Sequence, residues 1–390
     1  MGIATTQKMK TKYMYKIICF ILLIIVLWRP LTSVYSLRDS YFSRGYAAQY
    51  PQLKSAYDTS QYVKKKNPGV IPDETFESFA GGEFLKGLNP ILIVHEHPPM
   101  GRYIIGLSIL LFDNAKTIIL FCMAIGTFGV FLIAKLILKK SIYALIPLAV
   151  FVNEPLYMSK LYFSPLLEPI QQVFIVFALY FFMRGILSKK YFGWFAATSV
   201  MLGFVIAIRF FALGAALCAS MVIFLVLKKN FKKLVVFFAS LPLALGVLFL
   251  AYTRTIESGY SLLDILKIQK YILVYHKSQL ISPLSFWDLI LFNRWHTWWA
   301  DKAITSDTQW ILVWPIAAIL IVLYIYFIAR KKMIPSTAEQ IVLFWIIAYI
   351  LLLSVGNSTT RYFLPLLPFF YILATSFVIK LYKLKHDKKN

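Results

Sequence analysis

The chain has 390 residues, of which 59% are hydrophobic, 17% aromatic and 15% charged. This composition is too apolar for a soluble domain and predicts an all-α polytopic membrane protein. The formal net charge of +24 lies in short lysine clusters between apolar runs, which is typical of cytoplasmic loops and argues against nucleic acid as a partner.

Apolar runs of about 20 residues predict about ten membrane-spanning helices. They are expected at residues 15–35, 116–138, 141–158, 163–184, 191–208, 210–227, 233–252, 309–329, 338–356 and 361–381. The lysines at 139–140, 189–190, 228–233, 331–332 and 380–389 all fall on the side of the N-terminal lysines, so both termini are expected in the cytoplasm. The predicted location is a membrane, the cell membrane if the chain is prokaryotic, with the basic start and first apolar run as an uncleaved anchor.

The chain reads as one membrane-embedded domain, 1–390, with two large loops on the non-cytoplasmic side. The first loop is residues 36–115 and the second loop is residues 253–308. The apolar stretch 103–112 is too short to cross a bilayer, so we expect it to lie along the outer surface. A juxtamembrane helix is expected soon after the first span.

The most unusual stretch runs His95-Glu96-His97-Pro98-Pro99-Met100-Gly101-Arg102. The two prolines fix φ and remove two backbone donors, which predicts an extended segment just before a helix. Glu96 is a candidate acid, base or metal ligand. The His-x-His spacing permits a divalent metal, but the sequence fixes no third ligand and no cofactor is firmly indicated.

Several other charged residues stand at membrane boundaries or within apolar runs. Asp39 directly follows the first span, where a partly desolvated carboxylate can act as a general base, although Asp is also a common helix cap. Arg209, Arg361 and Glu168 lie in or beside predicted spans, so each is expected to face a cavity or a charged partner, with snorkelling as the alternative for the arginines. Arg102 is expected at the interface, where it snorkels or binds phosphate.

These motifs resemble a family of membrane enzymes. An early Asp39 followed by His97-Pro98-Pro99-Met100-Gly101-Arg102 is similar to the GT-C type, lipid-phosphate-sugar-dependent glycosyltransferases of family 39, the protein O-mannosyltransferase and aminoarabinose transferase group. Arg361 and Tyr362, followed by two prolines, resemble the family's last membrane motif. Lys160 and Glu168 match its basic and acidic pair loosely, at wider spacing. The likeness is strongest over residues 36–230.

The resemblance implies a GT-C-like bundle with juxtamembrane helices on the outer side. It implies transfer of a sugar, a hexose such as mannose, from a polyprenyl or dolichyl phosphate to a hydroxyl of a glycan, lipid or protein, with inversion at the anomeric carbon. The implied residues are Asp39 and Glu96 for catalysis, Arg209, Arg361 and Arg102 for the donor phosphate, and His95, His97, Tyr41, Glu168 and Tyr362 for the sugar and acceptor pocket.

Two other classes stay open. A lipid-linked-sugar flippase or transporter would place its charges at the bilayer midplane and show inverted repeats, whereas this chain gathers its polar groups at one face. A structural assembly subunit would carry the same loop carboxylates without using them.

Overall fold

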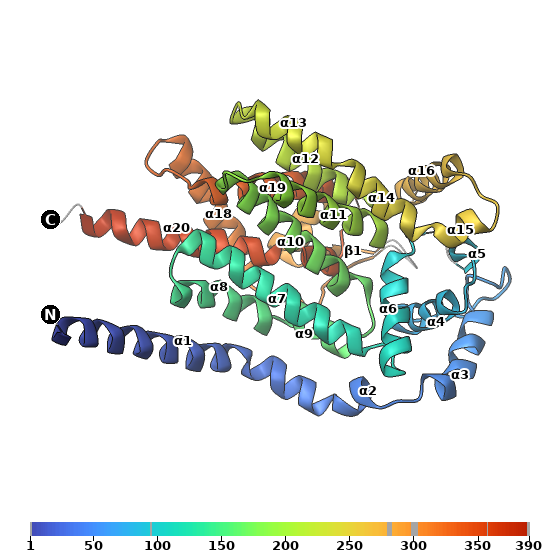
Figure 1. Cartoon of the computed structure of the whole chain (residues 1–390). Coiled ribbons are helices and arrows are strands. Elements are labelled where there is room, and N and C mark those ends of the chain that lie inside the picture. The colour runs from blue at the N-terminus through green and yellow to red at the C-terminus, as the bar shows by residue number, and fades with distance from the viewer. Residues whose placement is uncertain (1, 94–95, 279–282, 298–302, 357, 388–390) are drawn as a thin grey trace.

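The structure is a computed structural model that describes residues 2–93, 96–278, 283–297, 303–356 and 358–387. It is an all-helical bundle with one short β-hairpin (Figure 1). The predicted all-α membrane fold is therefore confirmed.

Six helices within the described residues are long and apolar enough to cross a membrane. They belong to α1 (Gly2–Ser36), α7 (Thr117–Leu138), α10 (Leu167–Leu187), α13 (Phe231–Ser240) joined to α14 (Pro242–Ala251), α19 (Thr337–Ser354) and α20 (Leu367–Asp387). Three shorter apolar helices of 17 residues each, α11 (Phe192–Ile208), α12 (Phe211–Leu227) and α18 (Val313–Ala329), coincide with further predicted spans. Each of the ten predicted spans contains a helix, and the number that cross the membrane stays a prediction.

The predicted span 141–158 is wrong as one straight helix. It consists of α8 (Ser141–Asn153) and α9 (Pro155–Tyr162), which meet at an angle of 55°. Proline disfavours helical backbone in the residue before it, and Glu154 accordingly adopts an extended conformation with φ −75° and ψ 152°. The last predicted span also begins later than expected, because residues Thr360–Phe363 form a separate 3-10 turn, η1, before α20.

Small residues bring the membrane helices close together. A Cβ added to Gly129 of α7 would lie 2.6 Å from Val176 of α10, and one added to Gly203 of α11 would lie 2.8 Å from the Ala244 carbonyl of α14. Because lipid tails are as apolar as the helices, such close packing is a main source of helix association in a membrane. Helix α10 thus lies at the centre, between α7 and α11 (Figure 1).

The two predicted external loops fold into short helices at one end of the bundle (Figure 1). The first loop holds α2 (Arg38–Phe42), α3 (Tyr46–Asp58), α4 (Asp73–Leu85), α5 (Pro90–Ile93) and α6 (Met100–Phe112); the second holds α15 (Thr253–Glu257), α16 (Leu262–Ser278), α17 (Ser285–Phe292), β1 (Trp295–His296) and β2 (Ile304–Thr305). The antiparallel hairpin pairs Trp295 with Thr305 and His296 with Ile304. The expected juxtamembrane helix is present, and α6 lies across the ends of the long helices as its short length predicts (Figure 1).

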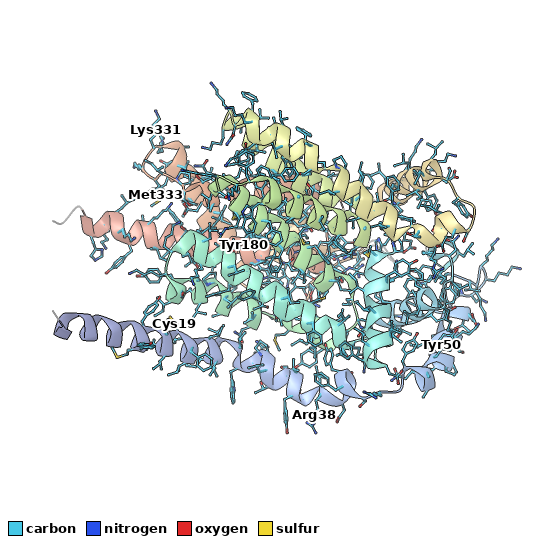
Figure 2. The ribbon with its side chains drawn as sticks, viewed as in Figure 1. Cys19, Arg38, Tyr50, Tyr180, Lys331 and Met333 are labelled. Carbon is cyan, nitrogen blue, oxygen red and sulfur yellow. The ribbon has the colours of Figure 1, made fainter. Side chains whose placement is uncertain are left out.

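The opposite end of the bundle carries both ends of the chain (Figure 1). Figure 2 places Lys331 and Met333 at that end, beside the turn between α18 and α19, and Tyr50 at the loop end. The loop helices and the basic turns therefore lie at opposite ends of the molecule, which is the polarity that the lysine pattern predicts.

Candidate functional site

Five charged side chains from separate parts of the chain converge at the loop end of the bundle. They are Asp73 of α4, Lys160 of α9, Glu168 of α10, Arg209 between α11 and α12, and Arg361 of η1. We call this group the charge cluster. It contains three cations and two carboxylates, so it carries a net charge of +1.

Glu168 is the centre of the charge cluster. One of its carboxylate oxygens lies 2.8 Å from Nη1 of Arg209 and 3.7 Å from Nε of Arg361. Lys160, which is buried, is close enough to Glu168 to interact with it electrostatically. With only 5% of the Glu168 side chain exposed, the carboxylate is a permanent partner of these cations rather than a solvated charge.

Arg209 reaches the charge cluster because the helix is broken there. Its backbone is extended, with φ −140° and ψ −163°, and separates α11 from α12. An unpaired arginine in an apolar segment is costly, so the break and the contact with Glu168 together satisfy the charge. The sequence prediction that Arg209 faces a charged partner is thus met by Glu168.

Helix α19 holds η1 in place. The hydroxyl of Tyr349 donates to the Tyr362 carbonyl over 2.8 Å, and Trp345 donates from Nε1 to the Pro365 carbonyl over 3.2 Å. The Tyr362 ring lies close to two guanidinium groups, 5.4 Å from that of Arg209 and 5.6 Å from that of Arg361. The aromatic face therefore helps to keep two positive charges close together.

The Arg361 side chain also joins the charge cluster to the first loop. Its Nη1 lies 2.5 Å from a carboxylate oxygen of Asp73, in the first turn of α4. Burial alone would lower the pKa of Arg361, but Tyr362, Glu168 and Asp73 beside it raise the pKa above its ordinary value. Arg361 is therefore a fixed cation. Sequence reasoning missed Asp73, whose one signal was its place after a proline at the start of an acidic helix.

The structure places Asp39 and Tyr41 on opposite sides of α2. The Tyr41 hydroxyl is buried and donates to the Leu161 carbonyl of α9 over 2.7 Å, which docks α2 beside Lys160. Residues two apart on a helix point about 200° apart, and the Asp39 side chain is 87% exposed with an ion pair to Arg38 at 3.8 Å. Asp39 therefore borders the loop end of the bundle without an ionic contact to the charge cluster.

The Pro-Pro stretch forms the entry to α6. Pro98 and Pro99 are buried, and Glu96 accepts a hydrogen bond of 3.2 Å from the Tyr62 hydroxyl. Tyr62 stacks on Phe76 with ring centroids 4.4 Å apart, which ties the motif to α4. His97 is half-buried, and His95 lies outside the described residues. In the part of the chain that is described, no three His, Cys, Asp or Glu side chains are grouped as a metal site.

Arg102 is buried and does not lie at the membrane interface, where the sequence predicted it. Its side chain is 1% exposed and pairs with Glu77 of α4, with Nη2 donating to Oε1 over 2.9 Å and Nε lying 2.8 Å from Oε2. The guanidinium also lies 5.2 Å from the Phe76 ring centroid. Arg102 thus joins α6 to α4, and two of its three guanidinium nitrogens face the Glu77 carboxylate.

The second loop contacts η1 one residue before Arg361. Thr360 donates to Asp307 over 2.6 Å, and Asp307 in turn accepts from its own loop at the Gln309 amide over 2.8 Å. In the same loop His296 and Asp288 are hydrogen-bonded over 2.8 Å. The 3-10 turn is therefore held between the two loops and α19.

An apolar groove runs along α1. Its volume is about 540 Å³, and its walls come from α1, α7, α8 and α9. On α1 it extends from Cys19 to Val34, which is about 22 Å of helix at 1.5 Å per residue. On α9 it includes Leu161, the neighbour of Lys160 in the chain. The groove has the length and lining to hold a hydrocarbon chain.

Comparison with known proteins identifies relatives of both the sequence and the fold. Residues 96–258, which begin at the Pro-Pro stretch and include Lys160, Glu168 and Arg209, match the family model of dolichyl-phosphate-mannose-protein mannosyltransferase. The fold is similar to that of ArnT from Cupriavidus metallidurans, bound to undecaprenyl phosphate (14% identity, TM-score 0.51) and in the apo state (15% identity, TM-score 0.52). No curated protein matches the chain.

Each structural alignment covers 86% of this chain and 59% of the ArnT chain, so the chain spans less than two thirds of the length of these relatives. The predicted resemblance to the family 39 group is confirmed by the family match and by the fold. The chain is accordingly an integral multi-pass membrane protein with a GT-C-like fold.

Proposed function

We propose that this chain, with the family match and fold of the family 39 glycosyltransferases, moves a sugar from a polyprenyl phosphate to an acceptor hydroxyl. The observation that carries the proposal is the charge cluster, which brings three cations together at the loop end of the bundle. Lys160 and Arg209 lie within the segment that matches the family model, and Arg361 lies in η1, which carries the last family motif. Mannose is a candidate sugar because the matching family model is named for dolichyl-phosphate-mannose. Polyprenyl phosphate is the carrier because a relative in fold binds undecaprenyl phosphate.

The donor phosphate is proposed to bind at Arg361, Arg209 and Lys160. Guanidinium groups match the oxygens of a phosphate, and charge-assisted hydrogen bonds of this kind are strong where water is scarce. Glu168 offsets one of the three positive charges and fixes the arginines at 2.8 Å and 3.7 Å, so the site is arranged before the donor arrives. Tyr362 provides an aromatic surface close to both arginines.

The chemistry needs a single base. Asp39 is the candidate that deprotonates the acceptor hydroxyl, which attacks the anomeric carbon as the bond to the phosphate oxygen breaks. The leaving phosphate needs no proton when cations stabilise its charge, and one displacement inverts the anomeric carbon. Glu96, with His97 beside it, is proposed to orient the acceptor from the wall made by Tyr62 and the Pro-Pro stretch. Tyr41 holds α2 against α9, and therefore sets where Asp39 lies.

The apolar groove is the proposed place of the polyprenyl chain. It passes Leu161 beside the charge cluster and continues along α1 through the span. A donor bound this way would have its phosphate at the loop end and its chain within the membrane. We propose that this end faces the non-cytoplasmic side, with both termini in the cytoplasm, because the basic turns lie at the other end.

A flippase or transporter without transferase activity is the alternative. The charge cluster lies at one end of the bundle rather than at its middle, which favours the transferase. Purified protein in liposomes with a radiolabelled sugar on polyprenyl phosphate distinguishes the two. Transfer of label to a hydroxyl acceptor is the expected result, whereas movement of intact donor across the bilayer without transfer would establish the alternative.

Variants of the proposed phosphate and base residues test the mechanism. Arg209→Gln removes a charged hydrogen bond of about 1.5–3 kcal/mol and should raise the KM for the donor roughly 10- to 150-fold. Asp39→Asn should abolish transfer while the donor still binds. Arg254→Gln is the matched control, because Arg254 of the second loop is half-exposed and pairs with Glu257 at 3.0 Å. Unchanged donor KM in Arg209→Gln, or normal turnover in Asp39→Asn, would refute the corresponding role.

A further inference from the structure

The two carboxylates of the charge cluster differ sharply in exposure. The Glu168 side chain is 5% exposed, whereas that of Asp73 is 57% exposed. Asp73 also approaches from a different layer, the first loop, and it contacts Arg361 at 2.5 Å from the outer side. Arg361 itself is 32% exposed, so the face that Asp73 covers is a face that an incoming anion can reach.

We propose that Asp73 is an internal anion that occupies the phosphate position on Arg361 until the donor displaces it. This inference rests on the proposed function of the charge cluster. A carboxylate and a phosphate use the same guanidinium donors, so they compete for Arg361. Asp73 thereby keeps the charge cluster closer to neutrality when no donor is bound, and the donor gains access by taking its place.

The energies allow this exchange at Asp73 and forbid it at Glu168. An ion pair that is partly exposed, as Asp73–Arg361 is, contributes about 0.2–1 kcal/mol, so a bound phosphate replaces it at little cost. Removing one partner of a buried pair costs about 3–5 kcal/mol, which keeps Glu168 in place. The body of α4 is fixed by the Arg102–Glu77 pair, so only the Asp73 side chain needs to turn away.

Asp73 has a second consequence after the transfer. The donor phosphate is a diester with one negative charge, whereas the product is a monoester whose second proton leaves with a pKa of about 6. At neutral pH the product is therefore the more negative of the two and would bind the three cations more tightly. Asp73 returning to Arg361 opposes this, and it favours release of the lipid phosphate.

The test measures binding and turnover in the full-length protein in detergent. The probe for binding is farnesyl phosphate, a short product analogue, and the probe for turnover is the polyprenyl phosphate sugar. Asp73→Asn should tighten farnesyl phosphate binding by about two- to fivefold, the equivalent of one exposed ion pair. It should also lower the donor KM and strengthen product inhibition, so that kcat falls. Asp73→Glu should keep wild-type behaviour, because it retains the competing charge.

Asp58→Asn is the matched control. Asp58 is another first-loop aspartate in an ion pair, 2.6 Å from Lys54 and 48% exposed, but it lies at the end of α3 away from the charge cluster. It should leave binding and turnover unchanged. Thermal unfolding of each variant identifies any loss of folding. If Asp73→Asn loses its fold, Asp73→Glu is compared with the wild type instead.

The outcomes separate the two proposals. Equal or weaker farnesyl phosphate binding by a folded Asp73→Asn variant, while the wild type binds and Arg209→Gln does not, would overturn the role of Asp73 and leave the phosphate site standing. If the wild type and Arg209→Gln bind the probe equally poorly, the phosphate site is wrong and the role of Asp73 is refuted with it.

Discussion

At the scale of single residues, the Arg102–Glu77 pair bears on the role of the Pro-Pro stretch. It decides whether this stretch binds the donor directly or only supports the fold around the proposed donor site. Both side chains are buried, and the guanidinium uses two nitrogens on the two carboxylate oxygens at 2.8 Å and 2.9 Å. Burial raises the pKa of Glu77, and the Arg102 guanidinium beside it opposes that rise. Each charge is therefore tolerated because the other is present.

Glu77→Gln should destabilise the protein by about 3–5 kcal/mol, because it leaves the Arg102 cation buried without its counter-ion. The measurement is denaturant or thermal unfolding of purified protein in detergent. A double variant, Glu77→Leu with Arg102→Met, removes both charges at similar volume and should recover most of the stability.

The double variant also tests the phosphate role that sequence reasoning gave to Arg102. If Arg102 supports the fold alone, the donor KM of the folded double variant should equal that of the wild type. A KM raised as far as in Arg209→Gln would return Arg102 to the phosphate site.

Sequence alone could predict the charges that lie in apolar surroundings, and it could not predict their partners in the loops. Glu168, Arg209 and Arg361 stand out because a charge in an apolar run must find a counter-charge or a cavity. Asp73 and Glu77 lie in a polar loop, where carboxylates are common and usually solvated. Their partners depend on where α4 packs, and that is decided by the tertiary fold.

At the scale of helices, the crossing of α4 and α6 sets the position of Asp73. A Cβ on Gly106 of α6 would lie 2.8 Å from the Gly81 carbonyl of α4, and one on Gly81 would lie 3.2 Å from the Gly106 amide. The two backbones therefore touch where neither helix carries a side chain. This contact, with the Arg102–Glu77 pair, fixes α4 against α6 and holds its first turn towards Arg361.

Gly106→Ala should force α4 and α6 apart and destabilise the protein by about 1–3 kcal/mol, because the added methyl meets backbone that cannot turn away. The expected functional result is a loss of the Asp73–Arg361 contact, so product inhibition should increase as in Asp73→Asn. The measurements are unfolding and inhibition of transfer by farnesyl phosphate.

Gly246→Ala provides the control for Gly106→Ala. Gly246 lies inside α14 and has nothing within 4 Å of an added Cβ, so alanine there should stabilise the helix by about 0.5–1 kcal/mol. Equal effects of the two substitutions would contradict the close crossing.

The bend between α8 and α9 is a feature of the helices that a hydropathy pattern does not predict. The apolar run across residues 141–158 suggests one span, and Pro155 was the local signal for a break. The buried Glu154 carboxylate at the bend accepts hydrogen bonds from Trp314 Nε1 over 3.2 Å and from the Tyr371 hydroxyl over 2.5 Å. These partners come from α18 and α20, which no local pattern can place beside α8.

At the scale of the whole molecule, the fold separates charge from hydrocarbon. The charge cluster lies at the loop end, and the basic turns and both chain ends lie at the other end (Figure 1). The apolar groove runs along α1 between these two ends. Composition and lysine spacing predict this polarity, because each end of a membrane helix must carry polar residues suited to its side. The groove could not be predicted, since it arises from loose packing of α1 against α7, α8 and α9.

Filling the groove should make the proposed sugar transfer sensitive to the length of the donor chain. Ala124 of α7 lines the groove, and Ala124→Trp would place a large side chain across it. Donors with long polyprenyl chains should lose about two- to tenfold in apparent affinity, whereas donors with two or three prenyl units should be unaffected. The loss is modest because a displaced chain exchanges protein contacts for equally apolar lipid.

The neighbouring residue provides the control for this prediction. Ile125 is 47% exposed and is not among the groove residues, so Ile125→Trp places the same side chain in surrounding lipid. Comparing donor KM across chain lengths in both variants separates occupation of the groove from a general effect of tryptophan on α7. If Ala124→Trp and Ile125→Trp show the same dependence on chain length, the polyprenyl chain lies elsewhere, and the charge cluster then binds a donor whose tail leaves the protein directly into the bilayer.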